Sequence, residues 1–277
     1  MSPKRSLKIL AGAVALTAAA PAAASAAQLT GVDDSNRLLS FSSSSPKKVS
    51  QRAITGLMPG ELIVALDRRP ANDQLYALSN TSRIYTVDQR SAQAVQVGPS
   101  PLNPGLLGDG FGWDFNPVVD RIRLTSNVGQ NLRLQPDAGV VAATDQNLAF
   151  APDDPNARTA PAVTGAAYTN NVPGATTTQL LDIDTANDVL ALQDPPNDGG
   201  LKTIGKLGVG NVTNPVAFDI SAKGEAFATL KITGKRGTML YTIDVKSGKA
   251  SKIGKVGKIR KGGRNGSYTL LGLTVTG

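Results

Sequence analysis

The sequence predicts an all-β fold built from repeated units of four short strands. The segment Asp67–Leu75 (DRRPANDQL) recurs as Asp114–Ile122 (DFNPVVDRI), 47 residues further along, with Asp, Pro, Asp and an aliphatic residue at matching places. Each unit contains an apolar run, a turn with Pro or Gly, an alternating run, a polar turn and two more short strands. A repeat of about 45–50 residues is typical of a propeller blade. We therefore predict a β-propeller of about five blades, with six blades or a β-sandwich as alternatives.

The first unit lacks its first strand. Its segment DDSNRLLSFSSSSPKK, from Asp33, aligns with SNTSRIYTVDQRSAQ of the second unit and places Arg37 on Arg83. The C-terminal segment YTLLGLTVTG, from Tyr268, resembles ELIVALDRRP, from Glu61, at the start of the second unit. We expect this C-terminal strand to complete the first blade, which closes the ring and removes exposed sheet edges.

The later units keep the same order. The fourth unit begins with VTGAAY at Val163 and continues with LLDIDTANDVLAL at Leu180. The fifth begins with VAFDISAKGEAFAT at Val216 and continues with LYTIDVKSGKASKIG at Leu240. The long segment 137–161, after the third unit, is where strands of a sixth blade could lie. Helices are not expected, because no stretch after the N-terminus sustains apolar residues at helical spacing.

Residues 1–26 have the pattern of a secretory signal peptide, and residues 27–277 are expected to form a single domain. A basic beginning is followed by an alanine-rich apolar run and by small residues at 24–26 that match a cleavage site. The apolar run falls short of the ~20 strongly apolar residues that span a membrane. We expect a secreted or cell-surface protein with no transmembrane segment in its mature chain.

The composition excludes several kinds of chemistry. The 277-residue chain contains neither Cys nor His, which excludes thiolate nucleophiles, imidazole bases and zinc sites built on those ligands. The spacing of Asp182, Asp184 and Asp188 does not match a calcium-binding loop. No cofactor or metal is therefore expected.

The polar stretch 114–134, DFNPVVDRIRLTSNVGQNLRL, is the first candidate site. Its Asp–Pro–Asp skeleton repeats that of the second unit, so we interpret Asp114 and Asp120 as turn residues of the scaffold. Four residues depart from the sister units and are candidate binding residues: Arg121, Arg123, Asn131 and Arg133.

Arg121 and Arg123 would share one face of their strand, and Asn131 and Arg133 would share one face of the next strand. If the two strands pair as a hairpin, the four side chains lie close together. A buried Arg must be paired, and Asp120 or Asp114 is the nearest candidate partner in the sequence. We favour an internal Arg–Asp network that holds one blade. The alternative is a patch for an anion or a sugar, because guanidinium groups suit carboxylate and phosphate.

Charge is distributed unevenly along the chain. Residues 200–277 contain 14 Lys/Arg against 3 Asp/Glu, a net charge of +11, whereas residues 27–199 contain 12 against 18, a net charge of −6. A basic region of this kind favours anionic partners. Its candidate binding residues are Lys252, Lys255, Lys258 and Lys261. Few aromatic residues lie among them, so nucleic acid is not an expected partner.

The motifs GWDFNPVVDRIRLTSNVGQNLRLQPDAG and YTNNVPGATTTQLLDIDTANDVLALQDPPNDG resemble an uncharacterised bacterial family, domain of unknown function 4394. The resemblance extends from about Leu29 to Thr276 and departs from the family pattern in the Lys/Gly-rich stretch Lys246–Arg264. It implies a secreted or cell-surface protein with a propeller-like fold. It implies no activity and no site residues.

Three functions fit these observations. The favoured one is a non-catalytic binding module at the bacterial cell surface, with an anionic cell-wall polymer, a polysaccharide or a surface protein as partner. A protein–protein platform is a second use of such a ring. The third is a carbohydrate-active hydrolase, which needs two carboxylates ~5–10 Å apart in an open pocket. Its candidates are Asp67, Asp114, Asp219, Glu61 and Glu225.

Overall fold

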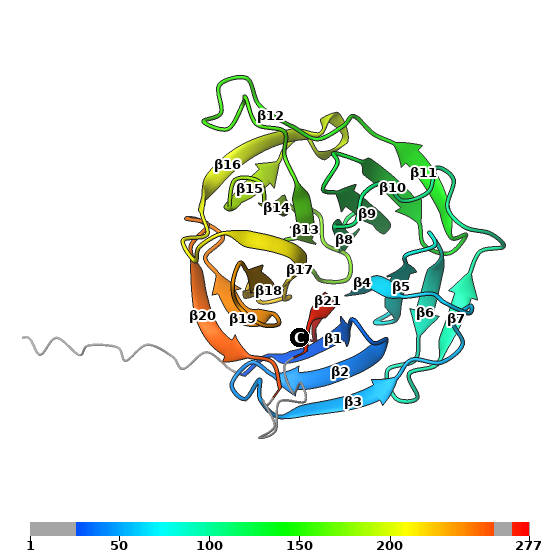
Figure 1. The fold of residues 1–277 in the computed structure, drawn as a ribbon. Coiled ribbons are helices and arrows are strands. Elements are labelled where there is room, and N and C mark those ends of the chain that lie inside the picture. Colours follow the sequence, from blue (N-terminus) through cyan, green and yellow to red (C-terminus); the bar gives the residue numbers. More distant parts are fainter. Residues whose placement is uncertain (1–25, 258–267, 277) are drawn as a thin grey trace, which may run out of the picture.

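The structure is a computed structural model that describes residues 26–257 and 268–276. These residues form five sheets arranged around a central axis as a closed five-bladed β-propeller (Figure 1). The predicted all-β fold and its five blades are confirmed, and the described sheets include neither a sixth blade nor a sandwich. All but the last residue of the predicted signal peptide lie outside the described residues, so that assignment stays a prediction.

Each blade extends from an innermost strand at the axis to an outermost strand at the rim. From the axis outward, blade 1 contains β21 (Leu270–Thr276), β1 (Gln28–Asp33), β2 (Arg37–Ser42) and β3 (Val49–Ala53). Blade 2 contains β4 (Ile63–Arg68), β5 (Leu75–Ser79), β6 (Ile84–Val87) and β7 (Ala94–Val97). Blade 3 contains β8 (Phe111–Asn116), β9 (Arg121–Ser126), β10 (Asn131–Gln135) and β11 (Val140–Thr144). Blade 4 contains β13 (Val163–Tyr168), β14 (Leu180–Asp184), β15 (Val189–Gln193), β16 (Gly200–Lys206) and β12 (Ala149–Phe150), with a short 3₁₀ helix, η1 (Pro196–Asp198), between β15 and β16. Blade 5 contains β17 (Val212–Ile220), β18 (Ala226–Ile232), β19 (Met239–Ile243) and β20 (Ala250–Lys255).

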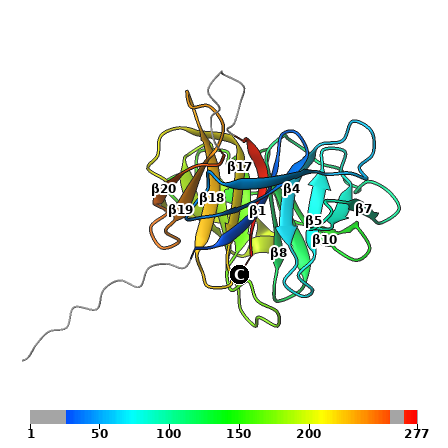
Figure 2. The same ribbon diagram turned by 90° about the horizontal axis from the view of Figure 1, so that it is seen from below.

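The ring is closed by the C-terminal strand, as the sequence predicts. Strand β21 pairs antiparallel with β1, and the register sets Leu29 opposite Val275 and Thr30 opposite Thr274. Figures 1 and 2 show β21 beside β1 at the centre of the ring, although the two strands come from opposite ends of the chain. Blade 1 is therefore the point where the two ends of the chain are joined.

The long segment 137–161 does not add a blade. It supplies β11, the outermost strand of blade 3, and then β12, which pairs in parallel with β16 at the outer edge of blade 4. Phe150 of β12 is buried against Leu201. The extra length thus covers the exposed edge of blade 4, which is one way that β proteins protect an edge strand.

The hydrophobic core lies between neighbouring blades. Tyr76 of blade 2 packs edge-to-face on Phe115 of blade 3, with ring centroids 5.1 Å apart. A second apolar cluster joins blades 4 and 5, and includes Ile183, Phe218 and Leu230. Alternating residues of the inner strands therefore bury apolar side chains against the next blade, which holds the ring together by hydrophobic burial.

The centre of the ring is closed rather than hollow. A Cβ atom on Gly272 of β21 would lie 2.5 Å from the backbone nitrogen of Leu66 in blade 2, so only glycine allows this approach. Gly112 of β8 is equally confined, with Ala166 Cβ of blade 4 at 2.6 Å. The space left between the inner strands has a volume of about 10 Å³, close to the minimum for one water molecule.

Candidate functional site

Arg123 lies in a buried network between blades 3 and 4. Its Nη1 donates hydrogen bonds to Asn131 Oδ1 (2.7 Å) and Asp145 Oδ2 (2.6 Å). Its Nη2 donates to Asn197 Oδ1 (2.8 Å) in η1 of blade 4. The side chain is only 2% exposed. The guanidinium therefore joins two blades from the inside and is shielded from solvent.

The predicted partner of this Arg is wrong. Its carboxylate partner is Asp145, which follows β11, and not Asp114 or Asp120. Arg133 donates to both oxygens of the same carboxylate, each at 2.9 Å. Asp145 belongs to the long connection after blade 3 and has no counterpart in the repeat. Its contact with Arg123 could therefore not be predicted from the alignment of the repeats.

Arg121 does not join this network. Its Nη1 donates to the backbone oxygen of Asp120 at 3.0 Å, and the side chain is partly exposed. The structure thus brings Arg123, Asn131 and Arg133 together and leaves Arg121 outside. Arg121 is at the first position of β9, at the end of the strand, where its side chain is partly exposed.

A second buried arginine, Arg69, joins blades 2 and 3. Its Nε donates to Asp120 Oδ1 (2.8 Å), and its Nη1 donates to Asp137 Oδ1 (2.5 Å) and to the Tyr76 hydroxyl (3.2 Å). The hydrogen bond from Arg69 lowers the pKa of Asp137. Sequence reasoning missed Arg69. A signal was present, because the third unit carries Asn116 at the matching position.

Three aspartates meet at the centre of the ring and are called the carboxylate hub: Asp67 of β4, Asp114 of β8 and Asp219 of β17. One oxygen of each lies within 4.8 Å of the others. All three side chains are buried, with exposed fractions of 0–1%.

Each hub carboxylate accepts a backbone hydrogen bond from the innermost strand of the next blade. Phe115 N donates to Asp67 (3.0 Å) and Tyr168 N donates to Asp114 (2.7 Å). Asp219 accepts from Val275 N at 2.6 Å. The hub therefore connects blade 2 to blade 3, blade 3 to blade 4, and blade 5 to the closing strand of blade 1.

The interpretation of Asp114 as a turn residue is wrong. It lies inside a strand, whereas Asp73 and Asp120 are the turn residues, with left-handed φ angles of 61° and 50°. The repeat showed that positions 67 and 114 were equivalent, but a one-dimensional alignment does not distinguish a turn from a contact between blades.

Burial dominates the ionisation of the hub. It raises the pKa of Asp67 to about 6. Burial also raises the pKa of Asp114 and of Asp219 well above the ordinary value, and the charges of neighbouring hub carboxylates raise both further. Low dielectric surroundings disfavour three negative charges at such short separations.

The hub does not fit glycoside hydrolysis. Its carboxylates are near enough to one another, but they are fully buried beside a closed centre, and a sugar must reach both catalytic groups. Glu61 is also buried, and it accepts hydrogen bonds from Ser79 and Tyr85 and from the backbone of Met58. Burial acts to raise the pKa of Glu61, but the hydrogen bonds from Thr81 and Tyr85 bring it below its ordinary value.

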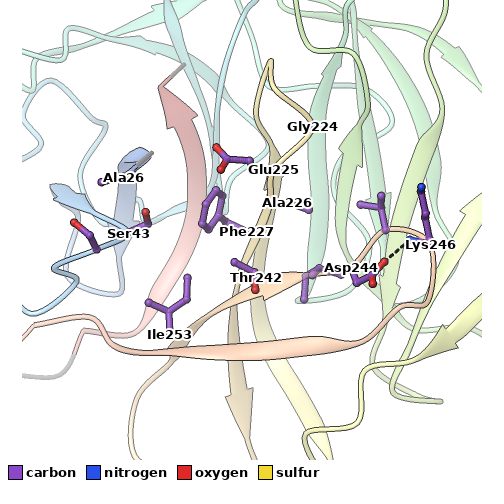
Figure 3. Close-up of a pocket in the computed structure, with 13 residues that line it drawn as sticks. Ala26, Ser43, Gly224, Glu225, Ala226, Phe227, Thr242, Asp244, Lys246 and Ile253 are labelled. Carbon is purple, nitrogen blue, oxygen red and sulfur yellow. Dashed lines mark hydrogen bonds between the residues drawn. The ribbon is translucent and has the colours of Figure 1, made fainter. Parts of the chain in front are cut away.

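Glu225 lies in a different place, at a groove between blades 5 and 1 that we call the apolar groove. Figure 3 shows Glu225 near Phe227, with Ile253 and Ser43 across the opening. The groove has a volume of about 510 Å³. Asp244 lines it too, but its Oδ1 accepts a hydrogen bond from Lys246 N (2.9 Å) as part of a turn. The surface is largely apolar with charges of both signs at its edge.

A second opening at the same seam is strongly basic and is called the basic cleft. It has a volume of about 600 Å³. Its charged residues come from blade 1 and from the β18–β19 region of blade 5: Asp34, Arg37, Lys231, Lys235 and Arg236.

Arg37 is the fixed member of the basic cleft. Its Nε donates to Asp33 Oδ2 at 2.7 Å, and its guanidinium lies 5.0 Å from the ring centroid of Tyr268. The hydrogen bond to Asp33 raises the pKa of Arg37. Lys235 and Arg236 are exposed, and the ion pairs formed by the described part of the chain do not include them.

Two of the four basic residues selected from the sequence, Lys252 and Lys255, lie outside the basic cleft. Lys252 and Lys255 are on β20, the outermost strand of blade 5, and line neither opening. Lys258 and Lys261 fall outside the described residues. Lysines recur every third residue in the stretch that contains these four, which made it the predicted anion-binding region. The short basic segment KITGKRG at 231–237 has only three basic residues and no such spacing, so it was not selected. The cleft could be found only once blades 5 and 1 were placed side by side.

These features define a closed five-bladed β-propeller with a buried polar centre and an exposed basic cleft. The chain belongs to the family described as domain of unknown function DUF4394, whose sequence profile matches residues 37–262. The resemblance noted from the sequence is thereby confirmed. A comparison with curated proteins gave no match. No helix in the described ranges is long and apolar enough to cross a membrane.

Solved structures with a similar chain trace share little sequence with this protein. One is a structural genomics protein of unknown function from Bacteroides thetaiotaomicron, at 12% identity and a TM-score of 0.49, covering 90% of this chain and 64% of that one. Another is YCF48 bound to D1 peptide, at 11% identity and a TM-score of 0.37, covering 82% of this chain and 64% of that one. The chain thus spans less than two thirds of each.

Proposed function

We propose that this protein is a non-catalytic binding module for an anionic polymer of the bacterial cell surface, and that the basic cleft is its binding site. The observation that carries the proposal is the convergence of four cationic side chains and one acidic one around a single opening. The predicted signal peptide, which implies export, supports a surface location.

The chemistry of the cleft suits phosphate or carboxylate groups on a flexible chain. Arg37 is held in place by Asp33 and Tyr268, so its position is set before a ligand arrives. Lys231, Lys235 and Arg236 can add contacts without first breaking an ion pair among the described residues. A surface-exposed cluster of this kind attracts anions over about a Debye length, ~8 Å at physiological salt, so binding must weaken as salt rises.

Retention on an immobilised anionic polymer, eluted with a salt gradient, tests the proposal. We expect the wild-type protein to be retained and the triple variant K231Q/K235Q/R236Q to elute at clearly lower salt. A matched control, K47Q/K48Q/K223Q, removes the same charge from exposed lysines away from the cleft and should elute near the wild type. Equal shifts for both variants would show that only net charge matters, and absence of retention would remove the proposal.

Surface location is tested separately. Expression of the full chain in a bacterial host, followed by fractionation, should give a product that has lost residues 1–26. A product that keeps these residues in the cytoplasmic fraction would contradict export.

A further inference from the structure

Among the residues that the structure describes, the three carboxyl groups of the hub have no basic side chain beside them to offset their charge when they ionise. Within residues 26–257 and 268–276, the ion pairs of the chain do not include Asp67, Asp114 or Asp219. Buried charges persist only when they are paired, protonated or bound to a cation. Something other than a Lys or Arg of the described chain must therefore neutralise the hub.

Hydrogen bonding favours ionised carboxylates at two of the three positions. Asp67 accepts at both oxygens, from the Thr274 hydroxyl (3.0 Å) and from Phe115 N (3.0 Å). Asp219 also accepts at both oxygens, from Val275 N and from its neighbour Ile220 N, each at 2.6 Å. Hydrogen bonds donated to a carboxylate stabilise its charged form.

The third carboxylate has an open position. Asp114 is 0% exposed, and its Oδ2 accepts from Tyr168 N. Its Oδ1 is buried and has no hydrogen-bond partner among the described residues. This unpartnered oxygen belongs to a carboxylate that has an oxygen within 4.8 Å of oxygens of Asp67 and Asp219. It requires an explanation, because buried polar atoms are rarely left without a partner.

We propose that the hub is the binding site of a single hard cation of the Ca²⁺ class, coordinated by oxygens of Asp67, Asp114 and Asp219. The hub oxygens lie within 4.8 Å of one another, about twice the ~2.4 Å length of a Ca²⁺–O bond. All the available donors are oxygens, which Ca²⁺ prefers, and Ca²⁺ tolerates irregular geometry. Mg²⁺ fits less well because it demands a near-ideal octahedron of oxygens at shorter distances, whereas Ca²⁺ accepts an irregular set.

A cation at this position joins blades 2, 3 and 5, and through Thr274 it is one hydrogen bond from blade 1. It therefore stabilises the closed ring and acts independently of the basic cleft. The competing explanation is that the hub carboxyls are neutralised by protons. The two explanations predict different responses to calcium.

Thermal unfolding of the purified full chain distinguishes them. The protein is first treated with a chelator, exchanged into neutral buffer, and then melted with either CaCl₂ or EDTA. At a free Ca²⁺ concentration ~100-fold above the dissociation constant, the Tm should rise by about 5–10 °C. Elemental analysis of calcium-loaded, gel-filtered protein should find one Ca²⁺ per chain.

Two variants locate the effect. Asp114→Asn keeps the shape of the side chain and removes one ligand charge, so its Tm should no longer respond to calcium. Asp182→Asn changes another fully buried aspartate outside the hub, and it should respond as the wild type does.

An unchanged wild-type Tm in CaCl₂ would overturn the proposal and favour protonation of the hub, as would an Asp114→Asn protein that still gains stability from calcium. If Asp114→Asn does not fold, terbium luminescence of the wild type decides the matter. Terbium bound at one site and displaced by calcium supports the proposal, and no saturable binding overturns it.

Discussion

Replacement of Arg123 by Ala should destabilise the fold strongly, because this side chain joins blades 3 and 4. The change removes three hydrogen bonds of 2.6–2.8 Å, to Asn131, Asp145 and Asn197. Breaking a buried ion pair costs about 3–5 kcal/mol when the remaining charge is left alone. Asp145 keeps its two hydrogen bonds from Arg133, so we expect the lower end, about 3 kcal/mol.

Arg121→Ala is the matched control. It removes an arginine two residues away on the same strand, whose guanidinium contacts only a backbone oxygen among its described hydrogen bonds. Loss of a partly exposed contact should cost about 0.5 kcal/mol or less. The difference in unfolding free energy between the two variants measures the effect of burial and ion pairing, because both variants lose one arginine.

Urea unfolding followed by tryptophan fluorescence measures both variants. The chain has a single tryptophan, Trp113, which is 4% exposed on β8 of the same blade. The midpoint should fall for Arg123→Ala with an unchanged m-value. Adding Asp145→Asn to the wild type and to Arg123→Ala should give a coupling free energy between the two positions above about 1 kcal/mol. Equal midpoints for the two arginine variants would refute the structural role of Arg123 and reopen a ligand-binding role.

Three further predictions concern the ring. In chelator, burial raises the pKa values of the three hub carboxyls in the folded protein, so their stabilising contribution is complete below about pH 4. The contribution of Asp67 is lost as the pH rises through its folded pKa of about 6, and the stability falls further at higher pH as Asp114 and Asp219 ionise. The urea midpoint should therefore fall with rising pH more for the wild type than for Asp114→Asn, and a larger fall for Asp114→Asn would contradict this sign. Gly272→Ala should lower the free energy of unfolding by about 1–3 kcal/mol, because the new Cβ would lie 2.5 Å from Leu66 N. Gly254→Ala is the control and should change the urea midpoint little, because its Cβ would meet nothing nearer than 3.6 Å. Comparable effects of the two changes would show that the ring centre is not tightly packed. Removal of residues 270–276 deletes β21 and should abolish the cooperative unfolding transition, and a truncated chain that unfolds as sharply as the wild type would show that closure is dispensable.

The fold was predictable because its main determinants are local and repeated. The Asp–Pro–Asp motif at 67–75 and 114–122 set the period, and the strand-like Tyr268–Gly277 segment showed how the first blade is completed. Both features depend only on which residues recur at what spacing. The four strands of each blade, a number of about five blades and the closure of the ring followed from them, while six blades stayed an alternative until the structure placed the segment 137–161.

The interior contacts were less predictable because they join residues that the repeat does not relate. Asp145, the partner of Arg123, belongs to a connection found after blade 3 alone, and Asn197 lies 74 residues away on the next blade. The grouping of Asp67, Asp114 and Asp219 follows from circular symmetry, which places equivalent strand positions together at the axis. An alignment of the repeats shows that these aspartates occupy equivalent positions, but it does not show that their side chains meet at the axis.

The basic cleft was also not predictable from the sequence, because its residues come from distant parts of the chain. Arg37 and Lys235 are almost 200 residues apart in sequence and line one opening because blade 5 lies next to blade 1. A net charge of +11 for residues 200–277 indicated an anionic partner but did not indicate where it would bind.

Direct titration with an anionic oligomer tests the binding role most sharply. Calorimetric titration of a glycerol phosphate oligomer at low and at physiological salt would compare the wild type with K231Q/K235Q/R236Q and with K47Q/K48Q/K223Q. We predict saturable, salt-sensitive binding that is lost in the cleft variant and retained in the control. Binding that is absent from the wild type, or equal in the wild type and the cleft variant, would contradict the role assigned to the cleft.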